Sequence, residues 1–182
     1  MSWVATPIPR GVILAIDPGP DKSGWCYFGD GRVQVSGISP NAEVRDLVRI
    51  GAADVLAVEM IASYGMAVGA DVFKTCVEIG RFIETWRDPE AVRLVYRRDV
   101  KLHLCGSARA KDPNVRAALI DLLGPPGTKK NKGPTYGVAS HAWSALAVAV
   151  VAEATAAGSA EDGGGGGAQK PSEDPVGAEE AP

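Results

Sequence analysis

Short apolar runs bounded by turn residues dominate the first part of the chain. The first run, residues 11–16, ends at the turn-forming sequence Asp17-Pro18-Gly19. Its short length and its branched residues are typical of a buried β-strand. Two further strands are predicted at 24–28 and 32–38, joined by a turn at 29–31. Together the three segments predict an antiparallel meander.

Helical periodicity then alternates with apolar strands. Apolar residues recur every three or four positions over 41–50 and 70–87, which predicts two amphipathic helices. Buried strands are expected at 54–59 and 91–96.

Basic and small residues characterise the second half of the chain. A basic stretch, 97–103, precedes a helix predicted over 112–123, with Asp112 as its N-cap and Pro113 at the first helical position. A loop rich in Gly, Pro and Lys, 124–137, is expected to be flexible. It leads to a helix of mostly Ala and Val at 140–156.

This order of elements predicts an α/β protein. It implies a mixed five-stranded sheet, with antiparallel strands 1–3 followed by helix-linked strands 4 and 5, and with helices on both faces. The pattern resembles the ribonuclease H-like fold. We divide the chain into an N-terminal extension, 1–10, a single domain, 11–156, and a tail, 157–182.

Composition limits the classes of protein that remain. A chain of 182 residues, 46% of them hydrophobic, suits one core. No apolar run reaches the ~18 residues of a membrane span, and no signal peptide is evident, so we expect a soluble cytoplasmic protein. Cys26, Cys76 and Cys105 show neither a zinc pattern nor close pairing and are interpreted as buried thiols.

The net charge of -3 hides two unlike regions. The segment 152–182 holds seven acids and one base, whereas the preceding 151 residues hold 18 bases and 15 acids. This tail, with its Gly163–Gly167 run, lacks the apolar bulk needed to fold and is predicted to be disordered. The body of the protein is therefore mildly basic, which is compatible with a nucleic-acid partner.

Two carboxylates stand at the ends of apolar strands. Asp17 closes the first strand and Glu59 ends the run Val55-Leu-Ala-Val. Asp17 by itself could be an ordinary turn residue, but two strand-end acids are costly to bury unless they are paired or bind a cation. If the two strands are parallel neighbours, both acids meet at one sheet edge and suit Mg²⁺.

His141 opens the last helix, directly after the basic loop. It is either a solvated residue of the first helical turn or a polar group that faces whatever the sheet edge binds, because the helix after it is otherwise built for burial.

These residues resemble the RuvC-type Holliday junction resolvases over about residues 11–151. The similarity rests on Ile13-Leu-Ala-Ile-Asp17-Pro-Gly with Ser23-Gly-Trp25, on Val58-Glu59, on Lys111-Asp-Pro-Asn-Val115, and on His141 before Ala145-Leu-Ala-Val-Ala149. More narrowly, the chain resembles resolvase-like proteins of actinobacterial phages in Glu59-Met-Ile-Ala-Ser-Tyr-Gly-Met66, Thr75-Cys76, Ile79-Gly-Arg-Phe82 and the Lys-Lys-Asn-Lys-Gly-Pro loop.

The resemblance implies an endonuclease that hydrolyses DNA at four-way junctions with two divalent ions, Mg²⁺ or Mn²⁺. Asp17 would bridge the ions, Glu59 would bind one, and His141 would bind or orient the other. The family's last helix usually carries an Asp three residues after its opening position, where this chain has Ser144. That hydroxyl could still hold a water, or the departure could mark a relative that binds junctions without cutting them.

DNA contact is expected from nine basic residues between 97 and 132, a segment with only three acids. They are Arg97, Arg98, Lys101, Arg109, Lys111, Arg116, Lys129, Lys130 and Lys132. Lys111 is our first choice for a base near the scissile phosphate. Tyr64 is predicted either to stack on an exposed base or to pack in the core.

One other interpretation and one assembly state follow. An actin- or hexokinase-like nucleotide-binding domain, with Gly24 in a phosphate cradle, is disfavoured because the chain has room for only half of such a protein, so no nucleotide cofactor is expected. A homodimer is expected because a junction presents two equivalent strands. The 70–87 helix could form its interface, although packing on the sheet accounts for its apolar residues, Phe73 and Phe82 included.

Overall fold

The computed structural model describes residues 11–63, 65 and 67–161. Five strands form one sheet: β1 (Ile13–Asp17), β2 (Lys22–Gly29), β3 (Arg32–Pro40), β4 (Val55–Met60) and β5 (Arg93–Tyr96). The helices are α1 (Asn41–Ile50), α2 (Ala70–Thr85), α3 (Arg97–Cys105), α4 (Asp112–Leu123) and α5 (Ala142–Glu161), with a short 3-10 helix η1 at Pro89–Ala91.

The sheet is mixed, as the element order predicts. Its strands lie in the order β3-β2-β1-β4-β5. β1 pairs antiparallel with β2 and parallel with β4, and β4 pairs parallel with β5. Asp30 and Gly31 adopt left-handed φ values of 53° and 68°, which gives the tight turn between β2 and β3.

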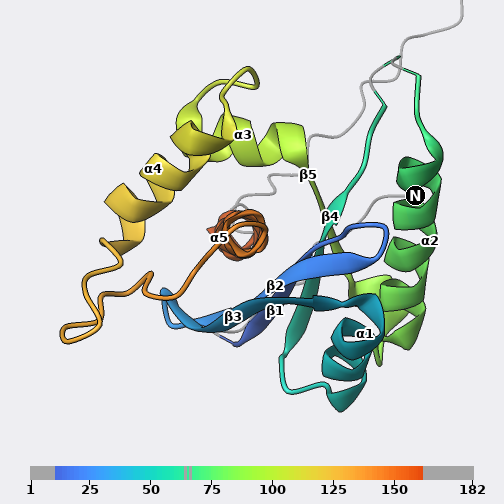
Figure 1. Ribbon diagram of the computed structural model, residues 1–182, viewed down its shortest axis with the longest axis horizontal. Coiled ribbons are helices and arrows are strands. Elements are labelled where there is room, and N and C mark those ends of the chain that lie inside the picture. Colours follow the sequence, from blue (N-terminus) through green and yellow to red (C-terminus); the bar gives the residue numbers. More distant parts are fainter. Residues whose placement is uncertain (1–10, 64, 66, 162–182) are drawn as a thin grey trace, which may run out of the picture.

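Helices cover both faces of the sheet (Figure 1). α1 and α2 lie on one face, while α5 lies across the other, with α3 and α4 packed outside it. The strands supply both cores by alternation. Ile13 and Ala15 pack on the α5 side, whereas Leu14 and Ile16 pack on the side of α1 and α2.

The small residues of α5 explain its central place. Ala145, Ala147 and Ala149 are completely buried, because a helix with short side chains can approach a sheet closely on one face and receive other helices on its remaining faces. Among the described residues, no helix is long and apolar enough to cross a membrane.

Three local expectations need correction. The basic stretch after β5 is a helix, α3, whose buried Val100 and half-buried Leu104 contact the core. Its few apolar residues stand among charged ones and give too weak a periodic signal, so packing decided its conformation. Asp112 is not the N-cap of α4; that residue is Lys111, whose backbone N–H donates to Oδ1 of Asn114 at 3.0 Å.

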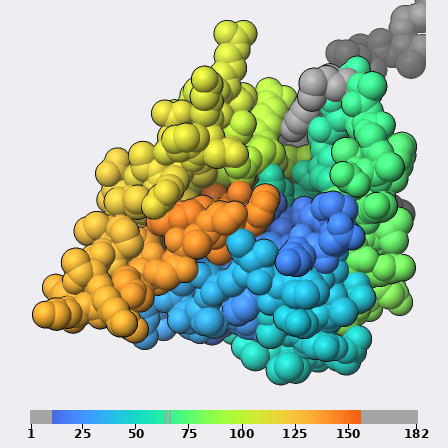
Figure 2. Space-filling view, in the orientation of Figure 1, coloured from blue at the N-terminus to red at the C-terminus, as the bar shows by residue number. Residues whose placement is uncertain are grey.

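The loop between α4 and α5 is ordered by its own hydrogen bonds. Gly127 and Lys132 form an antiparallel bridge, and the N–H of Thr128 donates to the carbonyl of Asn131 at 2.8 Å. At its base the hydroxyl of Thr135, which is fully buried, donates to the carbonyl of Gly124. We call residues 124–136 the finger, and it protrudes at one corner of the molecule (Figure 2).

The cysteines also differ from expectation. Cys26 is buried, but Cys105 is only partly buried and Cys76 is exposed on α2. Residues 1–10, the Gly163–Gly167 run and the rest of the tail beyond Glu161 lie outside the described residues.

Candidate active site

Strand alternation delivers the two candidate carboxylates to one place. Ile13 and Ala15 of β1, and Ala57 of β4, face α5. Asp17 and Glu59 continue those two alternating series and therefore project from the same face. The parallel register of β1 and β4, with Ile16 opposite Val58, sets the two acids side by side at the carboxyl ends of the strands, where open α/β sheets usually bind ligands.

Arg97 joins them from the neighbouring strand. Val95 of β5 pairs with Glu59 and also faces α5, and Arg97 follows it at the start of α3. Its Nη1 lies 3.7 Å from Oε2 of Glu59, and its Nη2 lies 2.5 Å from Oδ1 of Asp112. Arg97 therefore bridges β4 and the first turn of α4.

His141 reaches Asp17 from the start of α5. Its Nδ1 lies 3.0 Å from Oδ2 of Asp17, while 70% of its side chain is exposed. Gly24, opposite Asp17 on β2, makes this approach possible: a Cβ on Gly24 would lie 2.4 Å from the carbonyl oxygen of His141. Ser140 holds a left-handed φ of 45° immediately before it, a strained turn that aims the chain into α5.

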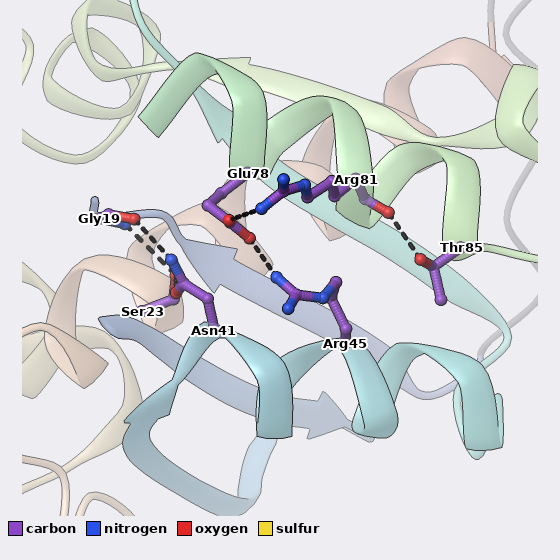
Figure 3. Close-up of polar contacts among 7 residues, drawn as sticks. All are labelled: Gly19, Ser23, Asn41, Arg45, Glu78, Arg81 and Thr85. Carbon is purple, nitrogen blue, oxygen red and sulfur yellow. Dashed lines mark hydrogen bonds and ion pairs between the residues drawn. The ribbon is translucent and has the colours of Figure 1, made fainter. Parts of the chain in front are cut away.

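A polar network fixes the turn that follows Asp17 (Figure 3). The buried hydroxyl of Ser23 donates to Oδ1 of Asn41 at 2.7 Å and accepts the N–H of Gly19 at 3.3 Å. Nδ2 of Asn41 donates to the carbonyl of Gly19 at 3.0 Å. The turn, and with it the direction of the Asp17 side chain, is therefore tied to α1.

The carboxylates are electrostatically unusual. Burial, and after it the charge of Asp17, raises the pKa of Glu59 to about 8, although Arg97 acts in the opposite direction. Burial likewise raises the pKa of Asp17, against the lowering effect of its hydrogen bond and charge interaction with His141. Perturbed acids beside a cleft are a recognised mark of functional sites.

Three clefts meet at these residues. One of about 180 Å³ is lined by Asp17, Glu59 and Arg97 together with residues 60–62. A second, of about 310 Å³, has Asp17, Lys22 and His141 in its wall. The largest, about 510 Å³, runs between α4 and α5 and is lined by Arg97, Asp112, Pro113, Val115, Arg116, Ala117, Ile120, Ser140, His141, Trp143 and Ser144.

The residues present suit a hard divalent cation. Oε2 of Glu59 is buried without a hydrogen-bond partner, and an orphan carboxylate oxygen beside a second carboxylate is the donor chemistry that Mg²⁺ prefers. Within the described part of the chain, no three His, Cys, Asp or Glu side chains converge tightly enough to form a metal cluster. Mg²⁺ is commonly held by one or two carboxylates with waters and substrate phosphates, so the pair is sufficient.

The predicted DNA-binding residues are only partly gathered here. Arg97 and Arg116 line the clefts, and the guanidinium of Arg116 stacks 4.9 Å over the ring of Trp143. Lys111 lines none of the three clefts. The remaining bases lie on α3, on the loop after it and on the finger: Arg98, Lys101, Arg109, Lys129, Lys130 and Lys132. Tyr64 lies outside the described residues.

Three positions have contacts that the sequence did not suggest. Asp112 anchors Arg97, Arg97 pairs with acids, and Gly24 makes room for His141. The alternation 93, 95, 97 could have indicated Arg97. Nothing local in the sequence could have brought Gly24 or Asp112 to this site, because their partners lie far away in the chain.

The fold and the position of these residues define a class of protein. The mixed five-stranded sheet with helices on both faces is the ribonuclease H-like fold. No family model matches the chain, and no curated protein matches it.

Among solved structures, the chain is similar to the Thermus thermophilus RuvC structure, with a TM-score of 0.60 and 20% identity over 81% of this chain and 97% of that one. It is also similar to T. thermophilus RuvC in complex with Holliday junction substrate, with a TM-score of 0.62 and 19% identity over 82% and 97% of the two chains. At this identity the likeness establishes the fold.

Proposed function

We propose that this protein is a divalent-metal-dependent endonuclease that hydrolyses phosphodiester bonds in branched DNA, with four-way junctions as its preferred substrate. The observation that carries the proposal is the pairing of Asp17 and Glu59, two mostly buried acids with side chains 16% and 12% exposed, at the ends of adjacent parallel strands in a chain with the fold of RuvC. The sequence motifs at 59–66, 75–82 and 129–134 further suggest a resolvase-like protein of an actinobacterial phage.

Asp17 and Glu59 would hold the cation or cations, with Ser144 as a hydroxyl ligand or a partner of a bound water. Bound Mg²⁺ or Mn²⁺ supplies water activation and charge stabilisation at the phosphate. The protein contributes the position of the acids, which the Ser23 and Asn41 network and the sheet register hold in place.

His141 is placed to move a proton. One ring nitrogen meets Asp17, and the exposed ring leaves the other free to accept a proton from an attacking water in the cleft. The Asp17 carboxylate orients the imidazole through the contact between its Oδ2 and Nδ1 of His141. In this arrangement His141 would act as the general base, and Asp17 would be the carboxylate that holds it in position.

DNA would cross the α3–α4 side of the molecule. The exposed bases of this surface and the lysines of the finger would contact phosphates, which gives affinity that depends on salt and on the shape of the DNA. The floor of the large cleft, formed by Trp143 and Val115, would face the nucleotide next to the cut.

A homodimer forms part of the proposal, and α2 offers an apolar surface for it. Packing on the sheet does not account for all its apolar residues, because Phe73 and Val77 are 62% and 53% exposed. Gly80, one turn further, has open space where a side chain would lie, so a second helix can approach closely. A second copy bound there would give one active site for each of the two equivalent strands.

The test of function is cleavage of labelled four-way, flap and duplex DNA and of an RNA:DNA hybrid in Mg²⁺ and in Mn²⁺. Asp17→Asn and Glu59→Gln are each expected to lower junction cleavage by about 10³-fold or more, with junction binding retained. Persistent cutting by both variants would exclude this site, and a preference for another substrate would revise the specificity. Nucleotide hydrolysis would revive the disfavoured alternative.

A second candidate function is junction binding without cleavage. It is favoured by Ser144, which stands where the resemblance implies an acid, and by the lack of a compact three-ligand cluster in the described residues. Wild-type protein that binds junctions but cuts none of the substrates in either metal would select this function.

The dimer is tested by light scattering or sedimentation. Val77→Asp is expected to convert a dimer to a monomer, whereas Leu122→Asp, at a similarly exposed residue of α4, should leave the mass unchanged. A wild-type monomer at high concentration would contradict the dimer.

A further inference from the structure

The contact between Arg97 and Glu59 is incomplete. At 3.7 Å, Nη1 of Arg97 and Oε2 of Glu59 are close enough for charge attraction but too far apart for a hydrogen bond. Both atoms are buried, and neither has another hydrogen-bond partner. Buried polar atoms are normally satisfied, so this pair is held in a position that its own attraction does not explain.

Asp112 supplies the missing restraint. Its carboxylate holds the other end of the guanidinium at 2.5 Å. Arg97 therefore lies between an exposed acid that binds it closely and a buried acid that it only approaches. The side chain of Asp112 is 73% exposed, so water can hydrate its carboxylate. The side chain of Glu59 is only 12% exposed, so its carboxylate depends on partners within the protein.

We propose that the Arg97 guanidinium serves as the positive charge beside Glu59 while the protein is free of metal. A divalent cation that binds to Glu59 displaces the guanidinium, and Asp112 keeps Arg97 close by. This inference rests on the cation site of the proposed function. It makes Arg97 and Asp112 positioning residues, a role that the sequence analysis gave to neither of them.

The physical reason is the cost of burying two acids together. Asp17 and Glu59 lie side by side with little access to water, and an unpaired buried charge is strongly destabilising. One guanidinium offsets part of that cost before a cation arrives. Once a cation binds to the acids, the same guanidinium repels it, so the two positive charges compete for one place.

The tether limits this competition. A guanidinium free to close on Glu59 would form a full ion pair and occupy both of its oxygens. Because Asp112 holds Arg97 back, Oε2 of Glu59 stays unpaired, in a residue that lines the 180 Å³ cleft. After displacement, the guanidinium would stay tethered to Asp112 and would be available to a DNA phosphate in this cleft, which Arg97 also lines.

Calcium binding to the full-length protein, without DNA, tests the competition. Calorimetry at about pH 9 keeps Glu59 largely ionised, since its pKa lies at about 8. Arg97→Gln is expected to bind Ca²⁺ at least about tenfold more tightly than wild type, and Arg97→Lys, which keeps the charge, should stay near wild type. Asp17→Asn should abolish the signal and so assign it to this site.

Asp112→Asn reports on the tether. It lets Arg97 close on Glu59 and is expected to weaken Ca²⁺ binding several-fold, an effect that should vanish in the Arg97→Gln background if Asp112 acts through Arg97. Arg87→Gln is the matched control: it removes a guanidinium that likewise stacks on an indole, 4.4 Å over Trp86, but lines none of the three clefts, and it should leave Ca²⁺ affinity unchanged.

Thermal unfolding gives an independent readout. In EDTA, Arg97→Gln should melt below wild type, and saturating Ca²⁺ should raise its Tm more than that of wild type. The proposal is overturned if Arg97→Gln binds Ca²⁺ no more tightly than wild type, if Arg97→Lys binds as tightly as Arg97→Gln, or if neither wild type nor Arg97→Gln binds Ca²⁺. If Arg97→Gln fails to fold, the Arg97→Lys and Asp112→Asn results decide. None of these measurements uses DNA. The role of Arg97 can therefore be confirmed even if the protein does not cut DNA.

Discussion

Two buried glutamates of this protein have opposite surroundings. Glu78, on α2, is 7% exposed and accepts hydrogen bonds from Arg45 of α1 and from Arg81 one turn along its own helix (Figure 3). Glu59, at the end of β4, has one guanidinium near it, at 3.7 Å, and one oxygen without a partner.

This difference distinguishes a glutamate that stabilises the fold from one that is available to bind a ligand. Glu78 has a guanidinium for each oxygen and joins two helices, so its charge is fully used within the fold. Glu59 keeps an unused oxygen and a raised pKa, next to a second acid and a cleft. A ligand can bind to a carboxylate that is shielded from water and lacks a full set of hydrogen-bond partners. The ligand then replaces the interactions that the carboxylate would make with water.

The first prediction sets these glutamates against each other. Glu78→Gln is expected to lower the free energy of unfolding by about 3 kcal/mol, because it leaves two arginines without their acid. Glu59→Gln in EDTA, above about pH 8, should leave stability unchanged or raise it, since it removes a poorly compensated buried charge. Urea denaturation measures both. Glu84→Gln, at an exposed residue of α2, is the control, and equal losses at Glu78 and Glu59 would remove the contrast.

The second prediction concerns the backbone beside Glu59 and Asp17. Gly24→Ala places a Cβ against the carbonyl of His141 and is expected to destabilise the fold by about 2 kcal/mol. Since it displaces His141 from Asp17, cleavage should also fall by roughly tenfold. Gly69→Ala, where a Cβ meets nothing within 4 Å, should change neither unfolding nor cleavage. Normal cleavage by folded Gly24→Ala would show that the position of His141 is unimportant.

A third prediction uses the raised pKa of Glu59. Between its ordinary value of 4.5 and about 8, the cation-free folded protein holds a proton that the unfolded chain has lost. Stability in EDTA should therefore fall as pH rises through that window, by about 1.4 kcal/mol per pH unit at most. Glu59→Gln should flatten the dependence by that amount, and saturating Ca²⁺ should do so as well. Urea denaturation across this pH range measures the slope for wild type and for Glu59→Gln. Identical slopes for the two proteins would contradict the prediction.

The smallest expected effect is at the satisfied network beside the site. Ser23→Ala leaves a carbonyl oxygen of Asn41 and the N–H of Gly19 without their partner and should cost about 1 kcal/mol. Ser63→Ala, at an exposed position, serves as control. Chemical denaturation gives the stability change, and hydrogen exchange at the N–H of Gly19 should speed up. Unchanged exchange would mean that the network does not hold the turn after Asp17.

Local pattern was sufficient for much of the architecture. Alternating and branched apolar runs identified all five strands, periodicity located α1 and α2, Pro113 marked the start of α4, and a run of small apolar residues located α5. The sequence did not indicate α3, because among its residues only Val100 is fully buried, with Leu104 and Cys105 partly buried against the core. Helical spacing assigns Phe73 to packing because it does not reveal whether a partner covers that face. Both errors concern which neighbours a segment meets.

The sequence by itself determined which residues carry the candidate chemistry: Asp17 and Glu59 end apolar strands, and a polar residue at a buried strand end is visible from neighbouring residues alone. Only the tertiary structure decided how they are combined. The parallel register of β1 and β4 places the acids side by side, Gly24 admits His141, and Asp112 holds Arg97 short of Glu59. Each of these contacts joins residues far apart in the chain, and their distances arise from sheet register and helix packing, which no local pattern encodes.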